Sequence, residues 1–411
     1  MNNYQKRREK LLKKLPNDSM TILFSGSPVR KSADGEYPFE SNRNFYYLTG
    51  IEEPEAILVL LKTDELNTSY LFIREIDEMM EKWVGIYIRP HQAREISGIE
   101  QVNFLSNFEG FVARQLHFNG IETMLLDSDR LSFEAIKSPA EQFAKKIKDL
   151  YPLLKLKNVS KKIAKLRLVK DESEIEKIKA AIKITDKGLR RMLSQMKPNQ
   201  YEYQYLAEVL YEFNKAGASE MFDSICASGP NGVILHYVSN DRLSEANELC
   251  LFDLGAKKDG YGADISRTYP VSGKFSERQK QLYDIVLGAM EEVKQAAKPG
   301  VTLAQLNQIV IDYYAEKLEA IGLIKNKSEV TKYYYHSVSH FLGLDTHDVG
   351  GVMGLKLEAG HVITNEPGLY IAEENIGIRI ENDLLITENG CIDLCEDVIK
   401  TTDEIEALMN A

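Results

Sequence analysis

The chain has little cysteine and no long apolar run. Its four cysteines in 411 residues, Cys226, Cys250, Cys391 and Cys395, form no CxxC pair, which excludes a disulfide framework and predicts reduced thiols. The apolar runs, such as residues 56–61, fall far short of the roughly 20 residues that cross a bilayer. No apolar stretch of signal-peptide length follows the basic N-terminus. We therefore expect a cytoplasmic protein with no membrane partner.

Basic charge is also scarce. There are 51 Lys and Arg against 62 Asp and Glu, so the net charge is −11, and this balance repels a phosphate backbone. Nucleic acid is therefore not an expected partner. The apolar fraction of 44% and the charged fraction of 27% are those of an ordinary folded protein. A length of 411 residues predicts two to three domains.

The two parts of the chain differ in pattern. Short β-like runs at 20–25, 56–61 and 69–74 alternate with helical stretches such as 108–116, which is typical of an α/β domain. A basic stretch, 155–170, holds seven Lys or Arg and no acid. Ser173 and Glu176 then form a capping box that starts a helix. We therefore place an N-terminal α/β domain at 1–160 and a second domain at 161–411.

The second domain mixes longer helices with strands. Helices are predicted at 203–216, 277–298 and 303–321, the last capped by Thr302 after Pro299-Gly300. Strand-like runs occupy 248–255, 262–271, 361–366 and 376–387. The overall fold class is therefore α+β.

Two acids are predicted to meet across a hairpin. Asp253 lies inside an apolar strand, and Asp259-Gly260 is a strong turn signal. With these two residues as the loop, Asp253 faces Ser266, and Asp264 is its diagonal neighbour on the same face. Two carboxylates in an apolar setting require a cation or a proton between them. Solvated loop carboxylates remain an open alternative for this pair alone.

Histidines cluster further along the chain. Three of the seven, His336, His340 and His347, lie within twelve residues, and imidazole is both a metal ligand and a proton carrier near pH 7. His361 falls where an apolar residue would serve, so we expect it to be structural. Glu366 ends a strand immediately before a proline, which favours extended geometry there.

The run 376–383 alternates strictly, which places Arg379, Glu381 and Asp383 on one face, Asp383 at an exposed rim. Four carboxylates and one imidazole form a hard, oxygen-rich ligand set that suits two Mn²⁺, Co²⁺ or Zn²⁺ ions better than a structural zinc. The set consists of Asp253, Asp264, His340, Glu366 and Glu381.

The order of these five residues, with SHFLGLDTHD, NEPGLY and GIRIEND around the last three, resembles the dinuclear metallopeptidases of the pita-bread fold, specifically the Xaa-Pro aminopeptidase (aminopeptidase P) family. The segments DGEYPF at 34–39, NFYYLTG at 44–50 and EPEA at 53–56 are similar to the creatinase-like N-terminal domain of that family. The resemblance implies that this domain serves oligomerisation and access to the active site.

The resemblance also implies two divalent metal ions, Mn²⁺ being favoured over Co²⁺ or Zn²⁺. Asp253 would bind one ion, Asp264 and Glu381 would bridge both, and His340 with Glu366 would complete the second. A hydroxide bridging the ions would attack the scissile carbonyl, and Glu366 would accept the proton.

Further site residues are carried over from the same resemblance. It assigns His347 and His336 to hydrogen bonding of the substrate and the tetrahedral intermediate, and His236 to the pocket on the proline side. Tyr370 and Arg379 stand at supporting active-site positions.

The expected function is removal of the N-terminal residue from peptides with proline second, by a homodimer or homotetramer. Prolidase, which cleaves Xaa-Pro dipeptides with the same metals, is the nearest alternative. A metal-free peptide-binding or protein-binding relative, or a creatinase, is a further one. The complete ligand set disfavours both metal-free classes, because uncompensated buried acids are costly.

Overall fold

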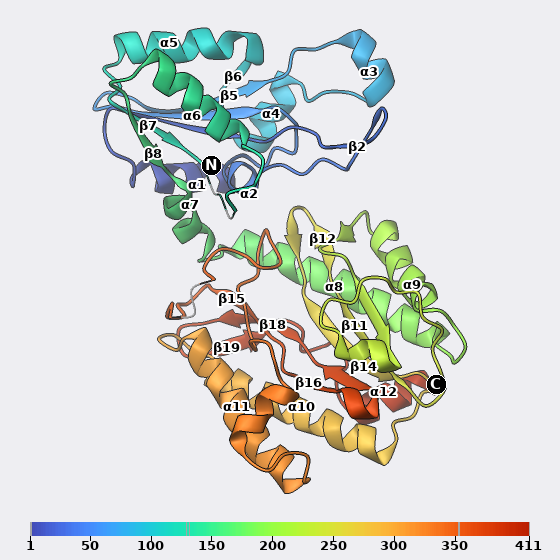
Figure 1. The fold of residues 1–411 in the computed structure, drawn as a ribbon. Helices are drawn as coiled ribbons and strands as arrows, with labels where there is room; N and C mark the ends of the chain where they lie inside the picture. The colour runs from blue at the N-terminus through green and yellow to red at the C-terminus, as the bar shows by residue number, and fades with distance from the viewer. Residues whose placement is uncertain (1, 129, 131, 352–353, 411) are drawn as a thin grey trace. The chain divides into compact units, whose positions relative to one another are not determined.

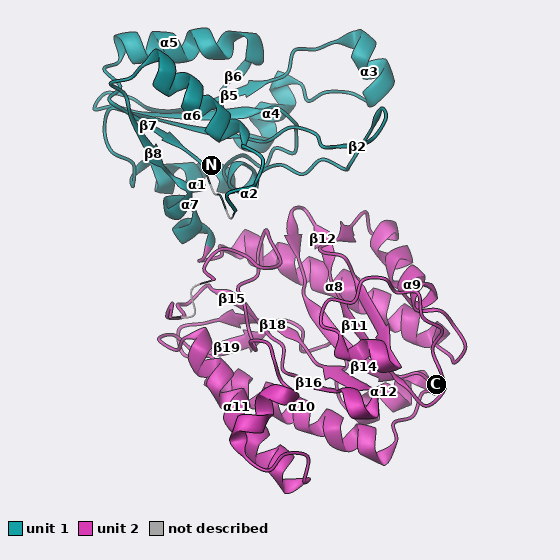
Figure 2. Ribbon diagram, viewed as in Figure 1, with its two compact units in different colours: residues 1–167 teal, residues 168–411 magenta. Residues whose placement is uncertain are grey.

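The structure is a computed structural model that describes residues 2–128, 130, 132–351 and 354–410. The chain divides into two compact units, residues 1–167 and 168–411 (Figure 2). All four cysteines are free thiols. In the described part of the chain, no helix is both long and apolar enough to span a membrane.

The first unit is built on a six-stranded sheet with the order β6-β5-β4-β1-β7-β8. The central strands β1, β4 and β5 pair antiparallel, and the outer strands pair parallel. The strands are β1 (Ser19–Phe24), β4 (Ile57–Lys62), β5 (Asn67–Ile73), β6 (Gln101–Phe104), β7 (Thr123–Leu126) and β8 (Lys155–Asn158). β1 and β4 are buried along almost their whole length, as expected of strands covered on both faces.

Helices flank this sheet (Figure 1). The helices α5 (Phe108–Phe118) and α6 (Pro139–Leu150) close one apolar core, in which the Phe72 ring packs against Phe108 and Phe111. The helices α1 (Asn3–Leu12), α2 (Arg43–Thr49) and α7 (Ser160–Arg167) pack against one another. The smaller elements are β2 (Arg30–Ser32), β3 (Gly35–Glu36), α3 (Glu78–Val84), α4 (Pro90–Ser97) and the 3-10 turn η1 (Leu105–Asn107). The predicted α/β class of this part is confirmed.

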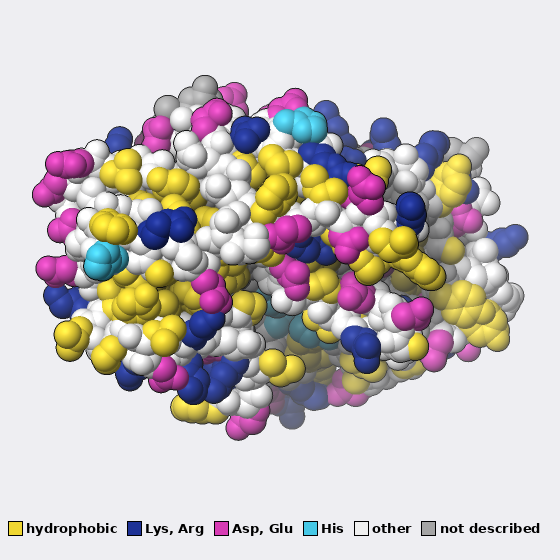
Figure 3. Space-filling view, turned by 90° about the horizontal axis from the view of Figure 1, so that it is seen from above, with side chains coloured by type: hydrophobic (Ala, Val, Ile, Leu, Met, Phe, Trp, Pro, Cys, Tyr) yellow, Lys and Arg dark blue, Asp and Glu magenta, His cyan; other side chains and the backbone are white. Residues whose placement is uncertain are grey.

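The surface of the first unit carries exposed apolar side chains. No residue of α3 is buried, and Trp83 is 80% exposed. Figure 3 shows apolar side chains among Lys, Arg, Asp and Glu on one face of the molecule. Charges of both signs lie side by side there, so the excess of acid is not gathered on this face.

The second unit contains one arrangement twice, a pair of packed helices followed by strands (Figure 1). The first half has α8 (Glu172–Gln195), α9 (Glu202–Lys215), β9 (Ser219–Glu220), β10 (Ile225–Ser228), η2 (Gly229–Val233), β11 (Leu249–Leu254), β12 (Ala256–Lys258), β13 (Tyr261–Gly262) and β14 (Ile265–Pro270). The second half has α10 (Glu277–Ala296), α11 (Leu303–Ala320), η3 (Lys327–Lys332), β15 (Val362–Asn365), β16 (Gly368–Ile371), η4 (Ala372–Glu374), β17 (Ile376–Arg379), β18 (Asn382–Ile386), β19 (Cys391–Asp393) and α12 (Thr402–Met409).

Small sheets carry the strands of this unit. Their orders are β10-β11-β14, β13-β12-β9, β15-β18-β19 and β16-β17. The strand β17 also lies against β11 and β14, so strands from both halves meet at the centre of the unit. The predicted α+β class is confirmed.

The predicted N-terminal cap of one helix in this unit is wrong in detail. The helix α8 is capped by Asp171 and Glu174, whose side chains bind each other's backbone N–H, and not by Ser173 and Glu176. The Ser173 hydroxyl instead donates to the Asp171 carboxylate. The predicted cap of α11 is correct, since Thr302 accepts the backbone N–H of Gln305.

The predicted strand 376–387 is in fact two strands in different sheets. β17 pairs with β16, whereas β18 pairs with β15 and β19. Between them the Ile380 N–H donates to the Pro367 carbonyl, and the Glu381 N–H donates to the Ser266 carbonyl. The backbone therefore changes partners at Glu381. Asp383, predicted at an exposed rim, is fully buried.

Candidate metal centre

The first two acids of the site stand on a hairpin as predicted. Lys258 pairs with Tyr261 around a turn in which Asp259 and Gly260 both have positive φ, 50° and 82°, the geometry of a type I′ turn. Further along, β11 and β14 pair with Asp253 opposite Ser266. Asp264 lies just before β14 and is 3% exposed.

The second half of the unit supplies the imidazole. The backbone of His340 bonds to Thr364 in β15, by its N–H to Thr364 Oγ1 and by its carbonyl to the Thr364 N–H. The Nδ1 of His340 lies 3.1 Å from the Phe341 carbonyl oxygen. A carbonyl can only accept, so Nδ1 carries the proton. Nε2 is therefore the nitrogen that faces the acids and is available to a metal ion.

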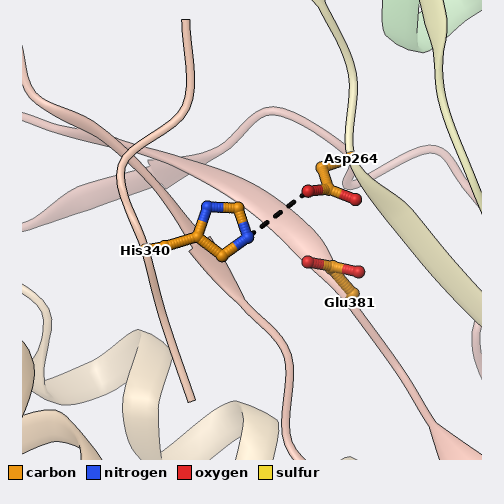
Figure 4. Close-up of side chains that lie close together, drawn as sticks. All are labelled: Asp264, His340 and Glu381. Carbon is orange, nitrogen blue, oxygen red and sulfur yellow. Dashed lines mark ion pairs between the residues drawn. The ribbon is translucent and has the colours of Figure 1, made fainter. Parts of the chain in front are cut away.

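Three of these side chains converge on one point (Figure 4). The Nε2 of His340 lies 3.4 Å from an Asp264 oxygen. It also lies 3.4 Å from an oxygen of Glu366. One ligand atom from each of Asp264, His340 and Glu381 lies within 4.8 Å of the others. Asp253 and Glu366 line the same pocket. The structure therefore gathers all five predicted ligand residues.

The buried carboxylates of this cluster need a cation to balance their negative charge. Burial, together with the neighbouring carboxylates, raises the pKa of Asp264 to about 6 and that of Glu366 to about 7, and it holds the pKa of Glu381 well above its ordinary value. Burial alone would lower the pKa of His340, but hydrogen bonding to Asp264 and the charge of Glu366 raise it to about 9. The Oδ1 atom of Asp253 is buried without a hydrogen-bond partner in the described structure. The donor set and this surplus of buried acid fit divalent metal ions.

Arg379 and Ser266 connect the ligand residues. The guanidinium of Arg379 donates to Asp253 at 2.6 Å, to the Tyr370 hydroxyl at 3.0 Å and to the Ser266 hydroxyl at 2.7 Å. The Ser266 hydroxyl in turn donates to Glu381 at 2.7 Å. Ser266 was not among the predicted site residues, although its place opposite Asp253 in the hairpin was a signal for it.

His336 is held as a neutral acceptor. Its Nδ1 lies 2.9 Å from the Ser337 carbonyl, so Nδ1 carries the proton, and the Tyr370 hydroxyl lies 2.9 Å from Nε2. Burial first, and then the charge of Arg379, lower the pKa of His336 to about 4. The ring is therefore uncharged at neutral pH.

A pocket of about 660 Å³ opens onto the metal centre. The predicted residues on its wall, besides the five ligands, are His236, His336, His347 and Arg379. Tyr370 is buried and is linked to the pocket through His336 and Arg379. Apolar side chains form much of the remaining wall, namely Phe222, Ile225, Leu235, Val238 and Leu303. Asp223, also on the wall, was not predicted.

His361 lies outside this pocket and is 2% exposed. Its Nδ1 accepts the Glu358 N–H at 3.2 Å, and its ring packs edge-on against Phe341 with centroids 5.3 Å apart. Burial, and then the charge of Lys170, lower the pKa of His361 to about 4.

The lowered pKa of His361 predicts that the free energy of unfolding depends on pH. Between pH 6.5 and about 4 the unfolded chain binds a proton at His361 that the folded chain does not, so the free energy of unfolding falls as the pH falls. His361→Asn keeps an acceptor but does not titrate, and it should remove about 2 kcal/mol of this loss. Urea unfolding of both proteins from pH 7.5 to 4.5 measures the difference. Equal slopes for the two proteins would contradict the prediction.

The chain matches two described protein families. Residues 176–388 match Metallopeptidase family M24, and residues 4–122 match the Aminopeptidase P, N-terminal domain. The Xaa-Pro aminopeptidase of Escherichia coli is 35% identical over 99% of this chain and 97% of its own length. Human Xaa-Pro aminopeptidase 3 is 30% identical over 95% of this chain and 81% of its own length.

Solved structures agree with these matches. A Bacillus anthracis protein provisionally assigned as an aminopeptidase P superimposes with a TM-score of 0.97 at 44% identity, covering 99% of this chain and 98% of that one. The aminopeptidase P of E. coli, solved with the inhibitor Pro-Leu, gives a TM-score of 0.91 at 34% identity over the same shares. The chain therefore belongs to metallopeptidase family M24 and carries the N-terminal domain of aminopeptidase P.

Proposed function

We propose that this protein is a metal-dependent aminopeptidase that releases the N-terminal residue from peptides with proline in the second position. The observation that carries the proposal is the cluster of Asp253, Asp264, His340, Glu366 and Glu381 beside a histidine-lined pocket. The near full-length relationship to Xaa-Pro aminopeptidases supports the same substrate class.

We assign these five residues as the side chains that would hold two divalent ions, with Asp264 and Glu381 contributing to both. When bound, the ions supply Lewis acidity and lower the pKa of water. Glu366 lies between His340, at 3.4 Å, and the Nδ1 of His336, at 3.8 Å. Its carboxylate on the pocket wall is the group that we assign to take up the proton from the attacking water.

The remaining residues orient the peptide and the ligands. Arg379 neutralises Asp253 and holds the Tyr370 hydroxyl, which in turn fixes the neutral His336. We assign His336 and His347 to hydrogen bonding of the substrate and of the tetrahedral intermediate. The His347 ring lies edge-on to His340, with centroids 4.4 Å apart.

A dedicated pocket is required on the proline side of the scissile bond. The proline nitrogen carries no hydrogen, and its ring fixes the backbone. We assign this pocket to the wall formed by His236 and the apolar side chains beside it. His236 is exposed there, where it can contact the ring or the backbone that follows it.

We further propose Mn²⁺ as the native metal, with Co²⁺ and Zn²⁺ as alternatives, because four carboxylates against one imidazole favour a hard ion. A cytoplasmic homodimer or homotetramer remains our expectation, with residues 1–160 as the oligomerisation domain and residues 161–411 as the catalytic domain. Metal analysis of the purified protein and size-exclusion chromatography with light scattering test these points.

The proposed activity is tested with three substrates, in the presence of Mn²⁺ or of a chelator. We expect metal-dependent cleavage of a tripeptide Xaa-Pro-Xaa, and no cleavage of its N-acetylated form, because the free amine marks an aminopeptidase substrate. The dipeptide Xaa-Pro is the control for the alternative activity. Cleavage of the dipeptide alone would identify a prolidase, and cleavage of the acetylated peptide would exclude an aminopeptidase.

A further inference from the structure

A buried glutamate outside the metal centre collects an unusual number of hydrogen bonds. Glu202, in the first turn of α9, is fully buried. Its Oε1 accepts the Ser228 N–H at 2.6 Å, the Ser228 hydroxyl at 2.8 Å and the Asn231 amide at 3.2 Å. Its Oε2 accepts the Tyr237 hydroxyl at 2.8 Å and the Arg242 N–H at 2.9 Å. Both oxygens are therefore saturated with donors.

All of these donors belong to one segment, residues 228–242. Apart from the short turn η2, the part of this segment after β10 has neither helix nor strand, so few backbone hydrogen bonds of its own hold it in place. Glu202 binds the segment near its start, through Ser228 and Asn231, and near its end, through Tyr237 and Arg242. One carboxylate thus closes the segment into a loop.

This loop carries part of the pocket wall. Leu235, His236 and Val238 all line the pocket, and they lie between the two points at which Glu202 holds the loop. His236 is exposed to the pocket, so its position depends on the backbone that bears it. Glu202 itself does not line the pocket.

The positive charge of the neighbouring Arg242 side chain is paired with a different acid, Glu248. The guanidinium of Arg242 pairs with both oxygens of Glu248, each at 2.6 Å, and it also donates to the Ser228 hydroxyl at 2.9 Å. The donors on Glu202 are therefore neutral hydroxyl, amide and backbone groups. Such donors fix geometry, and each hydrogen bond to a carboxylate is stronger than one between neutral groups.

We propose that Glu202 is a positioning residue that sets the affinity for the peptide by holding the loop 228–242, and with it His236, against the pocket. This inference rests on the proposed peptidase function. The hydrogen-bond partners of Glu202 are loop residues and not the proposed metal ligands, and Glu202 does not line the pocket, so it acts through the loop.

Two substitutions separate the parts of this arrangement. Glu202→Gln keeps one acceptor oxygen but turns an NH₂ group toward the other donors. If that NH₂ faces Tyr237 and Arg242, the tyrosine hydroxyl can rotate to accept, whereas the Arg242 N–H loses its acceptor. Glu202→Ala removes both attachment points. Glu208→Gln is the matched control, because Glu208 lies on the same helix and pairs with Arg191.

The test measures KM and kcat for an Xaa-Pro-Xaa tripeptide. We expect KM to rise about tenfold in Glu202→Gln and more in Glu202→Ala, with kcat within about threefold of wild type and full metal content. Glu208→Gln should match wild type. The double variant of Glu202→Gln with His236→Ala should have the KM of His236→Ala alone, because both changes remove the same contact. Additive effects, or a loss of kcat at unchanged KM, would overturn the proposal.

Hydrogen exchange provides a readout that does not depend on turnover. Backbone amides of residues 234–242 should exchange faster in Glu202→Gln than in wild type, while β11 should be unchanged. If the loop amides of Glu202→Gln exchange as slowly as those of wild type, the proposed role of Glu202 is overturned. If the wild-type chain cleaves none of the peptides, the proposed peptidase function is overturned, and the exchange experiment still tests the role of Glu202. If Glu202→Ala does not fold, Glu202→Gln and Tyr237→Phe, which removes a single donor, carry both measurements.

Discussion

Glu381→Ala is expected to lower kcat/KM by on the order of 10⁴-fold and to leave fewer than two metal ions per chain. The Glu381 carboxylate is 2% exposed and shares one point with Asp264 and His340. The Ser266 hydroxyl fixes its orientation. Under the proposed assignment Glu381 is a metal ligand, and alanine has no oxygen to take its place. Steady-state kinetics and metal analysis after dialysis measure the two effects, and Glu388→Ala on the surface is the control.

The same substitution should not unfold the chain. Burial and the charges of its neighbours raise the pKa of Glu381, Asp264 and Glu366, so these acids destabilise the metal-free protein as the pH rises from about 4.5 toward 7. Removing one of them relieves the repulsion. In chelator at pH 7, Glu381→Ala should therefore melt at or above the temperature of wild type. Full activity with normal metal content would exclude a bridging role for Glu381.

The parts of this site that could be predicted from the residues are those set by local geometry. The Asp259-Gly260 turn determines the pairing of the strands on either side, and this pairing places Asp253 opposite Ser266. Strand alternation also predicted Arg379 and Glu381 on one face, and both line the pocket, although the strand ends at Arg379. Local turn and strand rules are sufficient for such statements.

The unpredicted parts depend on contacts between distant segments. The break at Glu381 arises because its N–H bonds to Ser266 in the other half of the unit. Asp383 is buried next to Asp264, whose N–H donates to the Asp383 carboxylate at 3.2 Å. In the sequence, Glu202 is an ordinary acid at a helix N-terminus. Its hydrogen-bond partners in the loop 228–242 are seen only in the structure. No local pattern encodes these partners.

Lys170→Met is expected to destabilise the second unit by about 3–5 kcal/mol, because it removes the positive charge from a buried ion pair. The Nζ of Lys170 lies 3.0 Å from Asp348 Oδ2, and both side chains are 1% exposed. Lys170 also donates its backbone N–H to the Gly360 carbonyl. Chemical unfolding in chelator, followed by circular dichroism, measures the loss.

The matched control is an exposed pair of the same type. Lys145 and Asp149 lie 2.8 Å apart with side chains 70% and 63% exposed, so Lys145→Met should cost at most about 0.5 kcal/mol. Combining Lys170→Met with Asp348→Leu should recover part of the loss, since both charges of the buried pair are then removed. Equal costs for Lys170→Met and Lys145→Met would contradict the argument.

Because Asp348 follows His347 directly, the Lys170–Asp348 pair also anchors the chain beside the pocket. Lys170→Met should therefore weaken peptide cleavage even where the protein remains folded.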